Sequence, residues 1–411
     1  MVKIKFFKDR PIIIAALAAK ISQTPFEEGD IETLYRECKS DPIKAEELVN
    51  KIIINSGHLV LGDFLPYAIA LEDISRMAAI YIWRNVNTRN LIFGAGIEAS
   101  FRVIKPNRYN EASREVGERA FKFYEKAISL GVLEQDARYL LPEGTLTRMI
   151  FTAPPRYLLK LASSLKGTIL PELKEIGEEI EKIILQEFGF KNPAENLPSK
   201  WHFWGQDKLL KKISLSCETD NSIALELGIE GSLCMYAQLV RQRQLLCEIE
   251  PLEGIAKNGE FVIPSAFPEI IKEDYREIAE IARSKQLELI EKRDPSFVYF
   301  LLLGQQASSM IYGNGPSIIE TSKSRSEGVA QWEIRNKVGI PITKEFLKQK
   351  ESLGKTIGPR CWREGRCIEP KTFKEKKNVC RAFLRDKGHW QGSLEELLRV
   401  LEEPYDTFKI I

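Results

Sequence analysis

The chain has 411 residues, of which 44% are hydrophobic and 29% are charged. This composition is typical of a soluble globular protein and excludes disordered and collagen-like architectures. Its 60 Lys and Arg residues almost balance 58 Asp and Glu residues, so the formal net charge is only +2 and gives no global field for DNA or membranes. A local basic groove stays possible, because residues 348–385 are rich in Lys and Arg, whereas residues 395–403 are acidic. The length suggests two or three domains.

No apolar stretch reaches the roughly 18 residues that a membrane helix needs. The apolar run at residues 11–19 is short, ends at Lys20 and lacks a clear cleavage site, so it favours a buried helix over a signal peptide. Seven cysteines in a chain of this length do not make a disulfide scaffold. We therefore expect a cytoplasmic protein.

Helical periodicity dominates the chain, because apolar residues recur at spacings of three and four. The predicted helices cover residues 12–21, 44–55, 112–130, 170–188 and 273–292. Two strands are predicted at residues 63–71 and 223–229. Gly-Pro pairs predict turns or linkers at Gly315-Pro316 and Gly358-Pro359, and prolines at residues 192–200 predict a boundary near mid-chain.

A strand followed by a helix occurs twice, at residues 63–84 and 223–243, which suggests an internal repeat. Each helix ends in a basic element. The first reads Trp83-Arg84-Asn85-Val86 and the second reads Val240-Arg241-Gln242-Arg243.

The second half of the chain contains Arg325, followed after four residues by Ala330-Gln331-Trp332-Glu333-Ile334-Arg335. This resembles the R-x4-AQWEIR segment of the flavin-dependent thymidylate synthases, the ThyX family. Upstream, Gln238 to Arg243 is similar to the family's Q-x-x-R-H-R motif, with Gln242 in place of His. Asn314-Gly315-Pro316 stands where the family has an Asn-Ala-Arg turn.

The first half resembles the same family through other segments. Its matches are Glu134 to Pro142 for E-x-x-ARxxLP, Thr152 to Arg156 for T-x-N-A-R, Glu98 to Arg102 for E-x-S-x-R, and Gly57-His58 for a Gly-His pair. The resemblance covers roughly residues 10–345. It implies two fused ThyX-like units at 1–195 and 196–350, followed by a basic, Cys-containing C-terminal extension at 351–411.

The implied fold class is α/β (α+β), in which each unit is a small antiparallel sheet flanked by long helices. ThyX enzymes are homotetramers, so two fused units per chain imply a homodimer that is a pseudo-tetramer of units.

The two units have lost different parts of the family's site, which is shared between subunits. The second unit keeps Gln238, Arg241 and Arg325, but Pro251 and Glu253 replace the Ser and Arg of the E-x-S-x-R loop, and Tyr299 replaces the ARxxLP arginine. The first unit keeps Glu98, Ser100, Arg102 and Arg138, but carries Tyr81 and Leu165 at the Gln and last Arg positions. The retained parts are complementary, which predicts one working composite site per pair of units.

The resemblance implies roles for these residues. Gln238, Arg241, Glu98, Ser100, Arg102 and Arg138 would bind the nucleotide substrate, which suits guanidinium groups because they bind phosphate bidentately. Arg325 would be the catalytic residue at the uracil edge, where a fixed positive charge stabilises an electron-rich ring.

The family converts dUMP to dTMP with FAD, methylenetetrahydrofolate and NADPH, so these are the implied cofactor and co-substrates. The implied flavin contacts are Arg241, Gln242, Arg243, Asn314, Arg156 and His58. Pro316 and Glu320 depart from the Arg and Asn that the family has there.

Other readings remain open. Residues 331–335 could form an ordinary amphipathic helix, His58 could be a solvated residue at a helix end, and Arg138 could merely offset a helix dipole. The enzyme could act on another pyrimidine nucleotide. The chain could also be a non-catalytic paralogue that binds a nucleotide or nucleic acid, although the near-neutral charge argues against nucleic acid.

Three cysteines, Cys361, Cys367 and Cys380, lie near His389 in the C-terminal extension. Thiolates and an imidazole could hold Zn²⁺ tetrahedrally, but an iron–sulfur cluster usually takes four thiolates. The alternative is that these cysteines are reduced thiols or form a disulfide. Cys217, Cys234 and Cys247 fall on apolar segments and are predicted to be core residues.

Overall fold

The computed structural model forms two compact units, which we describe separately. The first comprises residues 1–74, 89–99 and 148–200, and the second comprises residues 75–88, 100–147 and 201–411. The residues that the structure describes are 10–24, 30–51, 65–88, 96–99, 105–188, 203–205, 209, 213–217, 223–242, 245–327, 330–349, 357–363 and 393–402.

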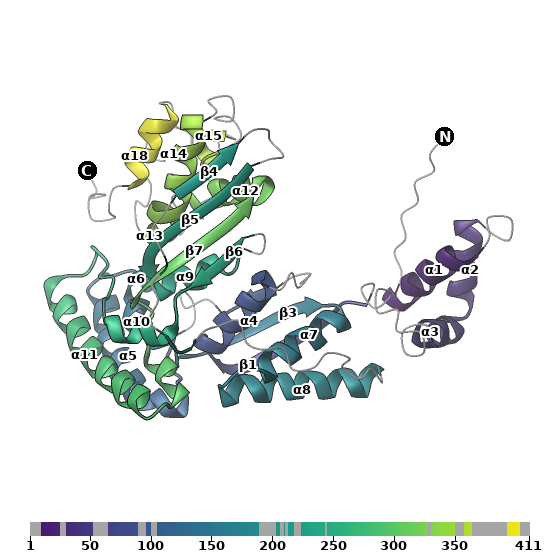
Figure 1. Ribbon diagram of the computed structural model, residues 1–411, viewed down its shortest axis with the longest axis horizontal. Helices are drawn as coiled ribbons and strands as arrows, with labels where there is room; N and C mark the ends of the chain where they lie inside the picture. Colours follow the sequence, from purple (N-terminus) through teal and green to yellow (C-terminus); the bar gives the residue numbers. More distant parts are fainter. Residues whose placement is uncertain are drawn as a thin grey trace. The chain divides into compact units, whose positions relative to one another are not determined.

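The first compact unit combines three N-terminal helices with a small sheet and two further helices (Figure 1). Its elements are α1 (Pro11–Gln23), α2 (Ile31–Ser40), α3 (Pro42–Asn50), β1 (Tyr67–Ser75), β2 (Gly96–Glu98), β3 (Leu146–Ala153), α7 (Pro155–Lys166) and α8 (Pro171–Phe188). Helix α1 packs against α2 and α3. The strands form a sheet in the order β1-β3-β2.

One face of this sheet is buried and the other is exposed. Along β3, Met149, Phe151 and Ala153 are buried, whereas Arg148, before them, and Ile150, between the first two, are exposed. This alternation follows from the period of two in a β-strand. Strand β2 runs antiparallel to β3, with Ile97 opposite Ile150.

The second compact unit contains elements from both halves of the chain. From the first half come α4 (Arg76–Thr88), η3 (Glu111–Ser113), α5 (Arg114–Ser129), α6 (Glu134–Ala137) and η4 (Arg138–Leu140). The rest are β4 (Ile213–Cys217), β5 (Ile223–Ser232), α9 (Leu233–Leu239), β6 (Leu246–Ile249), α10 (Leu252–Asn258), α11 (Glu269–Glu291), η5 (Pro295–Phe300), β7 (Gln306–Asn314), α12 (Gly315–Arg325), α13 (Trp332–Ile334), the π-helical turn η6 (Arg335–Gly339), α14 (Ile340–Gln349), α15 (Arg360–Arg363) and α18 (Leu394–Glu402).

The sheet of this unit is antiparallel, in the order β4-β5-β7-β6. Helix α12 packs against β5 and β7. The long helix α11 lies beside α5 (Figure 1), and ion pairs join Arg119 to Glu277 and Lys126 to Asp274 across them. Elements that are far apart in sequence therefore share one packed unit.

Helices α4 and α9 begin with the same set of hydrogen bonds. The hydroxyl of Ser75 accepts from Ala78 N and that of Ser232 accepts from Met235 N, each at 3.0 Å. In α4, the next two amides after Ser75 donate to Thr145 O and Glu143 O, in that order. In α9, the next two amides after Ser232 donate to Gln305 O and Leu303 O. The serine hydroxyls act as N-caps, which satisfy helix-end amides.

A second set of hydrogen bonds relates the loops that follow η4 and η5. Gly144 N donates to Tyr299 O at 2.9 Å, and Gly304 N donates to Tyr139 O at 3.0 Å. Between them, Pro142 and Leu302 form an antiparallel bridge. Because exchanging the partners of one bond gives the other, this contact has approximate two-fold symmetry, as isologous interfaces do.

The same hydrogen bonds correct one sequence assignment. Leu141 N donates to Arg138 O, and Leu301 N donates to Val298 O. Val298 therefore occupies the position equivalent to Arg138, and the expectation that Tyr299 does so was wrong by one residue. The conclusion that this position in the second half lacks an arginine is unchanged.

Most of the long predicted helices are confirmed. Helices α1 and α8 match residues 12–21 and 170–188, α11 matches 273–292, and η3 with α5 matches 112–130. Helix α3 covers the start of the predicted helix at 44–55, whose last residues lie outside the described part. Strand β5 matches 223–229, whereas β1 begins at Tyr67, later than the predicted residue 63. The mixture of helices and small antiparallel sheets confirms the α/β class.

The predicted turn at Gly315-Pro316 was wrong, because these residues begin α12. Asn314 caps this helix, and a proline in the first helical turn needs no amide partner. Gly358, with φ of +84°, precedes the short helix α15, as a turn would. The predicted boundary at residues 192–200 lies outside the described residues. The predicted units 1–195, 196–350 and 351–411 concern sequence repeats rather than contacts, so they stay predictions.

Part of the C-terminal extension packs within the second compact unit. Leu394, Leu397, Leu398 and Leu401 of α18 form a buried cluster with Ile340. At the carboxyl end of α18, Arg335 Nε donates to Leu401 O at 2.8 Å and Asn336 Nδ2 donates to Glu402 O at 3.2 Å. A cationic donor at this end satisfies free carbonyls and complements the helix dipole.

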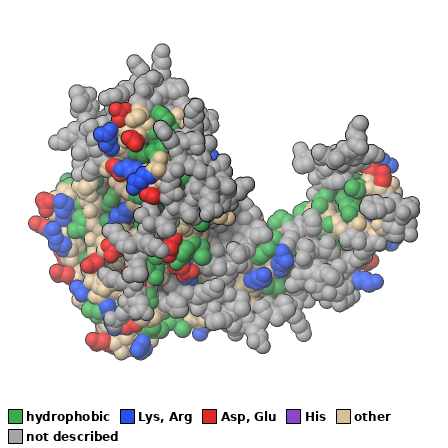
Figure 2. All heavy atoms as spheres, turned by 45° about the horizontal axis from the view of Figure 1, so that its top comes forward, with side chains coloured by type: hydrophobic (Ala, Val, Ile, Leu, Met, Phe, Trp, Pro, Cys, Tyr) green, Lys and Arg blue, Asp and Glu red, His purple; other side chains and the backbone are tan. Residues whose placement is uncertain are grey.

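The described surface carries mixed charge. On the face drawn in Figure 2, acidic and basic side chains lie interspersed over the described residues. Among those residues, no helix is long and apolar enough to cross a membrane.

We predict that α18 contributes substantially to stability. Leu397→Ala should lower the free energy of unfolding by about 2–5 kcal/mol, because Leu397 is fully buried and its truncation leaves a cavity. Glu395→Ala, on the exposed face of the same helix, should change it by no more than about 0.5 kcal/mol. Urea denaturation of both variants measures this, and equal effects would contradict the packing of α18.

Candidate functional site

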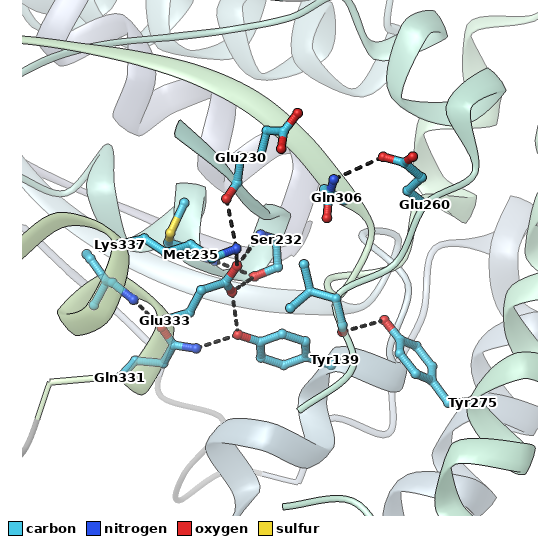
Figure 3. A network of polar contacts seen from close by, with 12 residues as sticks. Tyr139, Glu230, Ser232, Met235, Glu260, Tyr275, Gln306, Gln331, Glu333 and Lys337 are labelled. Atoms are coloured by element: carbon cyan, nitrogen blue, oxygen red, sulfur yellow. Dashed lines mark hydrogen bonds and ion pairs between the residues drawn. The ribbon is translucent and has the colours of Figure 1, made fainter. Parts of the chain in front are cut away.

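A buried carboxylate organises the centre of the second compact unit. Glu333 has no exposed surface. Its Oε1 accepts from Ser232 N at 2.8 Å and from Lys337 Nζ at 3.1 Å, and its Oε2 accepts from the Ser232 hydroxyl and from Tyr139 OH at 2.7 Å (Figure 3). A buried charge requires this kind of compensation. Glu333 therefore fixes the start of α9, because Ser232 is its N-cap.

Tyr139 joins this network from the first half of the chain. Its hydroxyl donates to Glu333 and accepts from Gln331 Nε2 (Figure 3), and its ring stacks near Trp332, with 6.5 Å between centroids. Burial, followed by the charge of Glu333, raises the pKa of Tyr139 well above its usual value. The hydroxyl thus remains a protonated donor, and the segment 331–333 is held against the residue next to Arg138.

Helix α9 and the turn after it carry three predicted site residues. Gln238 Nε2 donates to Cys234 O at 3.4 Å, along the helix. Arg241 lies in the turn and is partly buried. Gln242 follows, and with its amide oxygen toward Arg325 it accepts from Arg325 Nε at 2.8 Å and from Nη2. The structure therefore brings Gln242, which follows Arg241, against Arg325 of the R-x4-AQWEIR segment.

Arg325 is the last residue of α12, and a close backbone contact fixes this helix end. A Cβ atom built on Gly339 would lie 2.2 Å from the carbonyl carbon of Arg325. Only a glycine in the π-helical turn permits this approach. The Gln242 contact, which uses both Nε and Nη2, fixes the plane of the guanidinium group.

Asn314 lies at the opposite end of α12. Its side chain accepts from Ser317 N at 3.4 Å and from the Ser317 hydroxyl at 2.9 Å, and Asn314 N donates back to that hydroxyl at 3.0 Å. Its side-chain oxygen is thus engaged in a capping box. The structure does not bring Asn314 into the Gln242–Arg325 contact, because the two residues lie at opposite ends of the helix.

Arg138 stands beside Tyr139 and has donor capacity left. Its Nε donates to Gln135 O at 3.0 Å. Its Nη2 is buried, with no hydrogen-bond partner among the described residues. Its positive charge lies near Cys234, where burial raises the pKa of the thiol and Arg138 opposes this effect. A buried guanidinium nitrogen with a remaining proton suits an anionic ligand.

Glu98 and Arg156 belong to the first compact unit. Glu98 ends β2, is buried and lies opposite Met149 in the sheet. Arg156, in the first turn of α7, donates to Tyr157 OH at 2.8 Å, with its guanidinium 4.7 Å from the centre of that ring.

Several predicted residues lie outside the described part of the chain. These are Ser100, Arg102, Arg243, His58, Cys367 and Cys380, together with the side chain of Cys361. Where the structure describes the chain, no group of three or more His, Cys, Asp or Glu side chains could hold a metal ion. Zinc at the C-terminal cysteines stays a prediction.

Two of the three cysteines predicted for the core are confirmed. Cys234 and Cys247 are buried free thiols. Burial, followed by the charge of Glu248, raises the pKa of Cys247 to about 12. Neither thiol is therefore a ready nucleophile. Cys217 lies in β4, and its side chain is outside the described set.

Sequence reasoning missed the anchoring residues Ser232, Tyr139 and Lys337. The spacing of Glu333 and Lys337 by four residues is a recognisable helical ion-pair signal. A serine before an apolar helix is likewise a helix-start signal. No sequence signal points to Tyr139, because its partners are almost 200 residues away.

We predict that the carboxylate of Glu333 is essential for the folded arrangement. Glu333→Gln should lower the free energy of unfolding by about 3–5 kcal/mol, because an amide cannot accept from all of the buried donors and leaves Lys337 without its counterion. Glu402→Gln, which breaks the exposed pair with Lys344, should cost no more than about 1 kcal/mol. Chemical denaturation compares them, and similar values for both would refute the anchoring role.

Comparison with known proteins gives a family match for the first half of the chain. Residues 7–188 match the family model described as "Thymidylate synthase complementing protein". The chain is also similar to three curated proteins named flavin-dependent thymidylate synthase. The one from Saccharolobus solfataricus is 29% identical over 193 residues, which cover 44% of this chain and 72% of that protein.

The second relative, from Sulfurisphaera tokodaii, is 28% identical over 140 residues, covering 31% of this chain and 54% of that protein, or about half its length. The third, from Sulfolobus acidocaldarius, is 23% identical over 202 residues, covering 44% of this chain and 72% of that protein. Residues 7–188 are therefore similar to the thymidylate synthase complementing protein family, and the relatives named here are flavin-dependent thymidylate synthases.

Proposed function

We propose that the chain is a flavin-dependent thymidylate synthase-like enzyme that methylates dUMP to dTMP. The contact between Gln242 and Arg325 carries this proposal, because it joins the two motifs that the family uses at its nucleotide site. The relatives' names and the match over residues 7–188 support the reaction class. The chain would act on a nucleotide and a folate.

The active site would be composite, with residues from both ThyX-like units of a tandem repeat. Gln238, Arg241 and Arg325 would come from the second unit, and Glu98, Ser100, Arg102 and Arg138 from the first. The buried Nη2 of Arg138 supports this assignment, since it can still donate to an anion. Two chains would form a homodimer with four units and two such sites.

The retained arginines would act through their fixed positive charge and their hydrogen-bond donors. Arg241, Arg102 and Arg138 would bind the phosphate and orient the pyrimidine. Arg325, held in plane by Gln242, would stabilise negative charge that develops on the uracil ring as its C5 attacks the one-carbon unit. The proton at C5 must then leave, and no cysteine nucleophile is required.

The residues present are compatible with a flavin but do not define its whole site. Gln242, Arg241, Arg243, Arg156, His58 and Asn314 would contact FAD, although Asn314 already caps α12. Bound FAD, reduced by NADPH, would supply the hydride that completes the methyl group after transfer from methylenetetrahydrofolate.

The test is to purify the full chain with FAD and measure flavin absorbance, dUMP binding and dTMP formation. We expect Arg325→Ala to lower turnover by about 100- to 1,000-fold, the usual effect of losing a charge-stabilising donor, while flavin and dUMP still bind. Arg276→Ala, an exposed arginine of α11, serves as the control and should leave turnover unchanged. A wild-type chain that binds neither FAD nor dUMP would defeat the proposal.

A second candidate keeps this chemistry but changes the pyrimidine nucleotide. The observation that favours it is Gln242 itself, which replaces the family's His and holds Arg325 by two donors. An amide presents a different hydrogen-bonding edge from an imidazole, so the base that fits beside Arg325 can differ from uracil.

We predict that Gln242→His shifts nucleotide preference toward dUMP if this second candidate is correct. The measurement is the ratio of kcat/KM for dUMP to kcat/KM for dCMP and UMP, with about a tenfold change expected from exchanging one polar contact. Gln306→His serves as the comparison, since the amide of Gln306 donates to Glu260 at 2.9 Å and has no part in the proposed site. An unchanged ratio in Gln242→His would exclude the second candidate.

A further inference from the structure

Arg84 and Arg241 occupy equivalent positions at the ends of α4 and α9. Each lies nine residues after the serine that caps its helix, Ser75 or Ser232, and the two caps make matching hydrogen bonds. The surroundings of the two arginines can therefore be compared position by position.

Arg84 is enclosed by the chain. It is only 2% exposed, and its Nη2 lies 2.6 Å from Glu248 Oε2. It also forms a side-chain hydrogen bond with Tyr236, whose hydroxyl donates to Cys247 O. A buried guanidinium requires a counterion, and here Glu248 of β6 supplies it.

The strand register identifies the residue of the first half of the chain that is equivalent to Glu248. Ile150 and Met310 each lie eight residues beyond the bridge residues Pro142 and Leu302, so they are equivalent. Glu248 pairs with Met310, and Ile97 pairs with Ile150. Ile97 therefore takes the place of Glu248, so the position that is acidic in one half is apolar in the other.

The loop after β6 is also more acidic than the equivalent segment after β2. Five residues beyond Glu248 comes Glu253, and five residues beyond Ile97 comes Arg102. Glu253 accepts from Gly205 N at 2.7 Å and pairs with Lys257 Nζ at 2.7 Å. A carboxylate thus replaces a guanidinium at this position and is already engaged by the chain itself. The carboxylate of Glu248 already occupies the guanidinium of Arg84, which makes the surroundings of Arg84 unsuited to an anionic ligand.

We propose that Glu248 is a built-in anion that closes the second of two equivalent arginine sites. Its carboxylate takes at Arg84 the place that the anionic group of a nucleotide takes at Arg241. This rests on the proposed function only in assigning a nucleotide to Arg241. The chain then binds one nucleotide rather than two, and Arg84 serves packing instead of substrate binding.

Removing the carboxylate should convert Arg84 into an anion receptor. The experiment compares melting temperatures of the full chain in inorganic phosphate and in chloride at equal ionic strength. Phosphate should raise the Tm of Glu248→Gln by about 3–5 °C more than that of the wild type. The double variant Arg84→Met/Glu248→Gln should lose this response, because the receptor is gone.

Glu72→Gln is the matched control, because it removes a strand glutamate that pairs with the exposed Arg148, and it should gain no phosphate response. Glu248→Asp keeps the negative charge but moves the carboxylate away from Arg84, because the side chain is one methylene shorter. Its gain in Tm from phosphate should therefore be intermediate, and this variant tests the proposal even if Glu248→Gln does not fold. A response in Glu248→Asp and Glu248→Gln no larger than in the wild type would overturn the proposal.

Nucleotide stoichiometry gives an independent test. Calorimetry with dUMP should give about one nucleotide per wild-type chain, and two would overturn the built-in anion. If the chain binds neither dUMP nor FAD but Glu248→Gln still gains the phosphate response, the proposed function fails while the role of Glu248 stands.

Discussion

The burial of the Glu333 carboxylate is the constraint on which the second compact unit depends. A charge with no exposed surface must be met by donors, and here they come from the N-cap of α9, from Lys337 and from Tyr139. Ser232 and Tyr139 are far apart in sequence, so the carboxylate of Glu333 fixes the relative positions of their segments. Since α9 leads into Arg241 and Gln242, the orientation of the candidate site follows from a residue that need not touch a ligand.

The sequence is informative about elements with long periodic patterns and about motif identity. Helices α8 and α11 have enough turns for apolar spacing to be recognised. Strand β2 has three residues and α9 has seven, too few for either period to emerge. The expectation that Gln238, Arg241 and Arg325 share one site comes from motif resemblance alone, because no spacing rule connects residues more than 80 positions apart. The placement of α4 and residues 100–147 with the second half could not be predicted, since it arises from exchanged backbone hydrogen bonds.

The composition indicates only that residues 395–403 are acidic, but hydrogen bonds at both ends of α18 fix where this helix begins and ends. The Ser393 hydroxyl accepts from Glu396 N, and Glu396 accepts from Ser393 N, which is a capping box. At the other end, Arg335 satisfies a terminal carbonyl. Arg335 lies two residues after Glu333, so one short segment binds the start of α9 on one side and the end of α18 on the other. The extension is thereby coupled to the residues that position the candidate site.

The two arginines at the ends of α4 and α9 illustrate how related positions can diverge. A guanidinium removed from water must find a negative partner, either within the chain or from a ligand. At Arg84 the partner is covalently part of β6, so the ion pair forms on folding and its strength is independent of ligand concentration. At the equivalent position in β2, a strand of the other sheet, Ile97 carries no charge and is 72% exposed. With Arg241 as the proposed nucleotide ligand, the difference between Glu248 and Ile97 would separate a structural arginine from one that serves a substrate, which motif inspection of the arginines alone would not distinguish.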